Sequence, residues 1–123
     1  APISLWQPMS HLGAEIAGVA GAWGHSHLLA DDQELARSFY QKTFSLDLAD
    51  SDGATLGGSL EHWNAPRRSL WLVIFIVDDV DASVEATIRL GGTHRGKVDM
   101  PVATAAFVTD DQEAAFALVS SDS

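Results

Sequence analysis

The sequence predicts an α+β fold in which two βαβββ modules form a curved sheet around a cleft, preceded by an extra N-terminal strand. The first observation is a repeat: residues 28–34 and 75–81 each lead from an apolar run into two aspartates and then into helix-forming sequence. Asp31 and Asp78 are 47 positions apart (78 − 31), which leaves room for about two or three short strands after each helix. The second observation is size, because 123 residues, 46% of them hydrophobic, suit a single core.

Residues 1–21 are predicted to be an N-terminal strand and linker, and residues 22–123 a single domain. Residues 1–8 alternate apolar and polar side chains after Pro2 and stop at Pro8, as an edge strand does. A lone edge strand leaves backbone groups unpaired. We therefore expect this strand to complete the sheet of a neighbouring subunit, and the protein to be a homodimer.

The first module is predicted to open with a strand over residues 23–30, in which alternation places Trp23, His25 and His27 on one face. A helix over residues 32–44 follows, with Asp31 as its N-cap. Its expected buried stripe consists of apolar or small side chains at helical spacing: Leu35, Ala36, Phe39, Tyr40 and Thr43. Weaker strands are predicted over residues 46–49 and 54–63.

The second module is predicted to open with a strand over residues 69–77 that is apolar on both faces and therefore central in the sheet. The helix over residues 79–90 places Val80, Val84 and Ile88 on one stripe and ends at two glycines. Strands over residues 93–97, 102–108 and 114–119 complete the module.

The composition excludes several classes of function. Seventeen acidic residues against seven basic ones give a net charge of −10, which disfavours nucleic acid and anionic membranes as partners. No cysteine is present, so thiolate chemistry and cysteine-based metal sites are excluded. No apolar run is long enough for a membrane span, and no signal peptide is evident. We expect a cytoplasmic protein whose partner is a small molecule.

The order of these segments resembles the vicinal oxygen chelate superfamily, which includes glyoxalases, bleomycin resistance proteins and extradiol dioxygenases. Residues 32–40 resemble the first helix of that family, residues 77–84 with Leu90-Gly91-Gly92 its second module, and residues 107–118 its closing hairpin. Residues 5–8 and 11–14 resemble the junction before the second domain of a tandem two-domain member. The resemblance implies a glyoxalase-like sheet around a cleft.

Metal-dependent members of this family carry four ligand positions, two from each module. His25 matches the first position and Glu61 is a candidate for the second, whereas the positions in the second module fall on Leu72 and Ala117, which are apolar. His27 could add a third ligand beside His25 by strand alternation, which would give a facial cluster with Glu61. A divalent metal held by His25, His27 and Glu61 is therefore an alternative, and no cofactor is expected otherwise.

Two functions from different classes remain open, together with a purely structural role in assembly with another domain. The first is a metal-free domain that sequesters or senses a partly apolar ligand, for which a cationic ligand would suit the acidity. The second is a metal-dependent lyase, isomerase or dioxygenase, so the sequence does not decide whether the protein is an enzyme. The predicted cleft lining combines aromatic, polar and apolar side chains: Trp23, His25, His27, Glu61, Trp63, Leu72 and Ala117.

Overall fold

The computed structural model describes residues 3–5, 7, 9–10, 16–48, 54–56, 69–100 and 103–121, with only the backbone described at positions 55, 56, 100 and 121. Its elements, in chain order, are β1 (Trp23–Leu29), α1 (Gln33–Phe44), β2 (Ala54–Leu56), β3 (Leu70–Ile76), α2 (Val80–Arg89), β4 (Thr93–Met100), β5 (Ala103–Thr109) and β6 (Ala115–Ser121). The predicted α+β class is confirmed.

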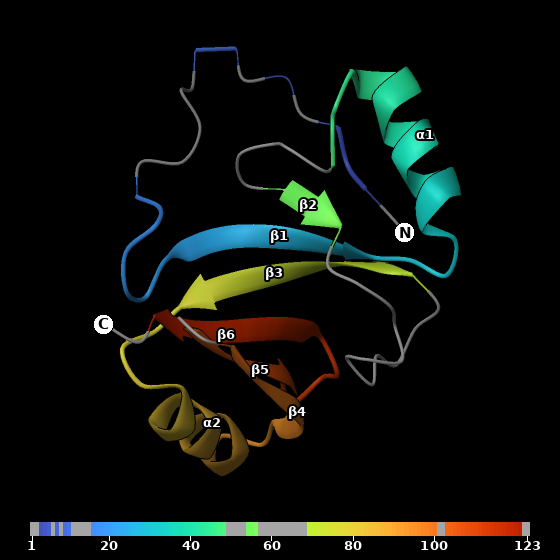
Figure 1. Ribbon diagram of the computed structural model, residues 1–123. Helices are drawn as coiled ribbons and strands as arrows, with labels where there is room; N and C mark the ends of the chain where they lie inside the picture. The colour runs from blue at the N-terminus through green and yellow to red at the C-terminus, as the bar shows by residue number, and fades with distance from the viewer. Residues whose placement is uncertain are drawn as a thin grey trace.

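All six strands form one mixed sheet in the order β2-β1-β3-β6-β5-β4 (Figure 1). The two strands that lead into helices, β1 and β3, pair antiparallel with each other, and each has a parallel neighbour on its other side, β2 for β1 and β6 for β3. β5 pairs antiparallel with both β6 and β4. The prediction that residues 69–77 form a central strand is therefore confirmed.

The repeated Asp-Asp sequence starts both helices. Asp32 accepts a hydrogen bond from the Leu35 amide (2.9 Å), and Asp79 accepts one from the Ala82 amide (3.0 Å), as N-cap side chains do. The predicted cap at Asp31 is therefore wrong by one residue. Asp31 precedes the cap, because the first helical turn places the Leu35 amide within reach of Asp32.

The elements of the second half follow the predicted order: β3, α2, β4, β5 and β6. In the first half, the described residues form β1, α1 and β2, and the predicted strand over residues 57–63 lies outside them. Residues 46–48 are not in a strand, and Leu48 is buried beneath α1 in a cluster with Leu28 and Tyr40. Two complete βαβββ modules thus remain a prediction.

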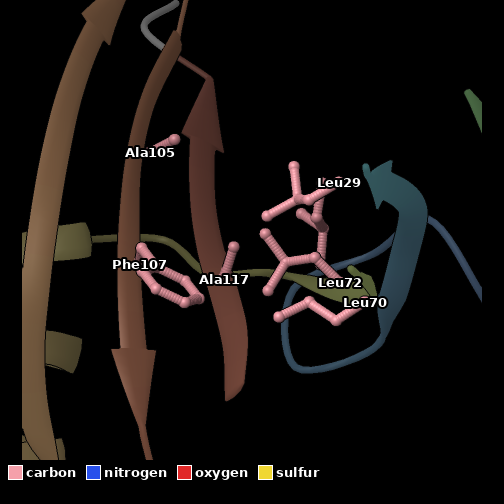
Figure 2. Packing of buried hydrophobic residues seen from close by; sticks show 7 residues of the cluster. Leu29, Leu70, Leu72, Ala105, Phe107 and Ala117 are labelled. Carbon is pink, nitrogen blue, oxygen red and sulfur yellow. The ribbon is translucent and has the colours of Figure 1, made fainter. Parts of the chain in front are cut away.

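The main core lies on one face of the curved sheet. Figure 2 shows Phe107 and Ala117, from β5 and β6, pointing toward Leu70 and Leu72 of β3 across the inside of this curve. Buried side chains on the opposite face pack against α2, including Val108 and Leu118. Side chains from the strands therefore pack against one another on one face of the sheet, and the helices pack on the other face.

Several positions that were predicted to be buried are exposed. Leu35 is 69% exposed and Phe39 52% exposed, so only Tyr40 of the α1 stripe is fully buried. Ile88 is exposed at the end of α2, and Val73 and Phe75 of β3 are partly exposed. Each helix contacts the sheet over only part of its length. The prediction from helical periodicity assumes that the sheet covers the whole apolar stripe.

Residues 3–5 and 7 are not in a strand within this chain, so the extra N-terminal strand is not formed there. Its predicted pairing with a neighbouring subunit stays a prediction. In the described part of the chain, no helix has the length and apolar character needed to cross a membrane.

Candidate functional site

The two histidines of β1 lie on the same face of the sheet, as alternation predicts. His25 is paired with Ile74 and His27 with Leu72 across the antiparallel β1–β3 ladder. Directly paired residues in such a ladder share a face. The histidines therefore lie beside the apolar face that Leu72, Ile74 and Ala117 form on β3 and β6.

Trp23 lies on the other face, which corrects the prediction that it faces the same side as His25. Trp23 is paired with Phe75, whereas His25 is paired with Ile74, so an irregularity at Gly24 interrupts the alternation. The indole N–H of Trp23 donates to the hydroxyl of Ser26 at 3.0 Å. Since Ser26 alternates with His25 and His27, Trp23 belongs to the opposite surface.

At this irregularity the backbone of Gly24 lies close to β3. A Cβ atom at Gly24 would lie 2.7 and 2.8 Å from two side-chain carbons of Ile76. Contacts that short force a neighbouring group to move. The glycine thus has a packing reason, because a side chain at this position would require Ile76 to move.

His25 and His27 form an edge-to-face pair with their ring centroids 4.9 Å apart. Burial lowers the pKa of His27 below its ordinary value of 6.5, and the neighbouring His25 lowers it further by charge repulsion. His27 is therefore predominantly neutral at pH 7, and its imidazole can serve as hydrogen-bond donor and acceptor toward a bound molecule.

The apolar residues of the predicted cleft lie in the packed core. Leu72 and Ala117 each have no exposed surface, and Phe107 is equally buried. Ile74, which the sequence did not single out, is the direct cross-strand neighbour of His25. Strand register identifies Ile74, and register depends on the whole sheet rather than on local sequence.

Glu61 and Trp63, the remaining predicted members, lie outside the described residues. Where the structure describes the chain, no group of three or more metal-binding side chains comes together. Among the predicted metal-ligand positions that the structure describes, His25 and His27 provide two imidazoles. The two ligand positions of the second module hold the carbon side chains of Leu72 and Ala117. These described residues alone do not fit the four-ligand site that the resemblance implies.

The molecule is thus an α+β domain with a mixed sheet, compatible with a glyoxalase-like fold, that carries a partly buried histidine pair beside an apolar face. No protein-family model matches the chain.

Individual relatives are nevertheless found. In an alignment of 133 positions the chain is 32% identical to "Anthracycline biosynthesis protein DauV" of Streptomyces sp. (strain C5), and in one of 135 positions it is 30% identical to "Anthracycline biosynthesis protein DnrV" of Streptomyces peucetius. In an alignment of 134 positions it is 29% identical to "Putative glyoxylase CFP32" of Mycobacterium bovis. Each alignment covers 97% of this chain, which spans about half the length of the curated relatives it matches.

Proposed function

We propose that this chain is a small-molecule-binding domain of the glyoxalase and bleomycin resistance type. The observation that carries the proposal is the position of His25 and His27, which are partly buried beside an apolar face on the central strands. A few polar groups against a mostly apolar wall are typical of small-molecule sites. Similarity to a protein named a putative glyoxylase, over nearly the whole chain, supports membership of the family.

In this proposal the domain sequesters or senses its ligand. The neutral imidazole of His27 orients the molecule by hydrogen bonding. The acidity of the chain suits a cationic ligand. Because two of its relatives are named for anthracycline biosynthesis, anthracyclines are among the first compounds to test.

The test is a thermal-shift screen of untagged protein against small aromatic and cationic compounds, with a chelator present. A ligand at 100 times its Kd should raise the free energy of unfolding by about 2.7 kcal/mol. We expect the shift to shrink in His25→Ala and His27→Ala but to persist in His94→Ala, which replaces an exposed histidine on β4. Equal shifts in all three variants would place binding elsewhere and contradict the proposal.

A metal-dependent lyase, isomerase or dioxygenase is the second candidate, and the same histidine pair favours it. Under this alternative Glu61 would supply a third ligand. Metal analysis of the untagged protein, followed by thermal shift with divalent ions alone, separates the two functions. Stabilisation by a metal that is lost in His25→Ala would favour the enzyme, whereas stabilisation by an organic compound in the presence of chelator favours the binding domain.

A further inference from the structure

A pocket of about 540 Å³ lies between α1 and the end of β1, on the sheet face opposite the histidines. Its carbon lining includes Leu28, Leu35, Phe39 and Tyr40. Leu28 belongs to this other face because it alternates with His27 and packs with Tyr40. The volume falls within the range of about 300–1,000 Å³ that is typical of small-molecule sites. This pocket is therefore separate from the proposed histidine site.

One wall of the pocket is aromatic and held in place. Tyr40 is buried, and its hydroxyl accepts a hydrogen bond from Trp71 Nε1 at 2.8 Å. Tyr40 also contacts Phe39 edge to face, with a centroid distance of 5.1 Å. Leu35 and Phe39 are mostly exposed on the same helix. A flat apolar molecule in the pocket would cover carbon surface that now faces water.

The charge at the pocket favours a cation. Asp31 and Asp32 are part of the lining, and no lysine or arginine is among its described residues. The N-terminal end of α1 contributes a partial positive charge of about one half. Asp32 already faces that partial charge as the N-cap of α1, and the chain as a whole carries −10.

The second half of the chain offers an internal comparison. A pocket of about 520 Å³ at the start of α2 is lined by Asp78 and Asp79, the counterparts of Asp31 and Asp32. At the positions equivalent to Leu35 and Phe39, however, it has alanines, Ala82 and Ala86. The acidic pair is thus common to both pockets, whereas the large apolar wall is found only in the pocket beside α1.

We propose that the pocket beside α1 binds a planar aromatic molecule that carries a protonated amine. The ring packs against Phe39 and Leu35, and the amine lies near Asp31 and Asp32. This second binding site goes beyond the proposed function, because it uses the opposite face of the sheet and does not involve the histidines.

The test uses 9-aminoacridine, a planar aromatic cation at neutral pH, in a fluorescence anisotropy titration of the full chain. We expect Phe39→Ala to weaken binding about 3- to 10-fold, the size of one lost aromatic contact. Asp32→Asn should weaken it about 2- to 5-fold. Asparagine caps helices about as well as aspartate, so the Asn variant removes charge without removing the cap.

Matched variants on α2 serve as controls. The exposed fraction of Ile88, 53%, is similar to that of Phe39, 52%. Asp79 caps α2 as Asp32 caps α1. Ile88→Ala and Asp79→Asn should bind the probe as the wild type does, and so should His27→Gln. Acridine-9-carboxylate should bind more weakly than 9-aminoacridine. Absence of saturable binding, equal affinity for the carboxylate, or equal effects of the α1 and α2 variants would overturn the proposal.

Discussion

Trp71 on β3 donates its indole N–H to the hydroxyl of Tyr40 on α1, and the two rings meet edge to face with centroids 5.3 Å apart. Tyr40 is the one residue of α1 that is fully buried. This contact therefore attaches the first helix to the centre of the sheet, and it joins residues 31 positions apart in the chain.

Replacing Tyr40 by phenylalanine should lower the free energy of unfolding by about 1–3 kcal/mol, because it leaves the partly buried indole N–H without its partner. Urea unfolding measures the change. Trp71→Phe and the double variant complete a mutant cycle, in which the second substitution should cost less once the first is present. Strict additivity would show that the hydrogen bond contributes nothing.

Gly24→Ala should destabilise the protein by about 1–3 kcal/mol, since the added methyl group collides with Ile76. The matched control is Gly96→Ala on β4, where no atom lies within 4 Å of the new Cβ. Gly24→Ala should cost less stability when Ile76 is already alanine than it does in the wild type, because the shorter side chain leaves room for the added methyl group. Equal thermal denaturation of the two glycine variants would contradict the close packing at Gly24.

The lowered pKa of His27 predicts a pH-dependent stability. Between the pKa of His27 in the folded protein and a pH of about 6.5, the unfolded chain binds more protons than the folded chain. The stability that comes from a neutral His27 is therefore present above pH 6.5 and is lost as the pH falls through the folded-state pKa. Relative to pH 8, wild-type protein should lose more stability on acidification to pH 5 than His27→Gln does. Identical pH profiles from chemical denaturation would refute the buried neutral imidazole.

The neighbour of His27 supplies the smaller part of that shift. His25→Gln removes the repulsion between two positive rings, so the pKa of His27 should rise but remain below 6.5, because burial is the larger cause. An NMR titration of the imidazole signals follows His27 directly. A return of its pKa to 6.5 in this variant would show that charge, rather than burial, dominates.

Leu72→Ala should cost about 2–5 kcal/mol, as expected when a fully buried leucine leaves a cavity. Leu35→Ala on exposed α1 should change stability by less than about 0.5 kcal/mol. Equilibrium unfolding of both variants distinguishes a core position from a pocket wall open to solvent. A loss below about 1 kcal/mol for Leu72→Ala would mean that the inner face of the sheet is open around it.

Removal of residues 1–12 should convert a dimer to a monomer if the N-terminal segment pairs with a neighbouring subunit. Ile3 and Leu5 are exposed in the single chain, which leaves them available for such a contact. Light scattering of the 123-residue chain and of the shortened chain measures the mass. Replacing Leu5 by aspartate in the full chain provides a second variant that keeps the length, and an unchanged dimer in both would exclude this mode of assembly.

The strand and helix positions were largely predictable, because local patterns determine them. The Asp-Asp pairs marked both helix starts to within one residue, and the apolar run of β3 indicated a central strand. The same patterns did not predict which α1 side chains are buried. Leu35 and Phe39 have the spacing of a buried stripe, yet the sheet reaches only Tyr40.

The sequence by itself determined both helices, the strands that lead into them, the order of elements in the second half, and the shared face of His25 and His27. Strand alternation and helix capping act over a few residues, which is why local sequence is enough for these features. Only the tertiary structure decided the surroundings of those histidines. The register shift between Trp23 and His25 puts Trp23 on the opposite face, and packing in the main core buries Leu72 and Ala117. These outcomes depend on cross-strand register and on contacts between residues far apart in the chain, which no local pattern encodes.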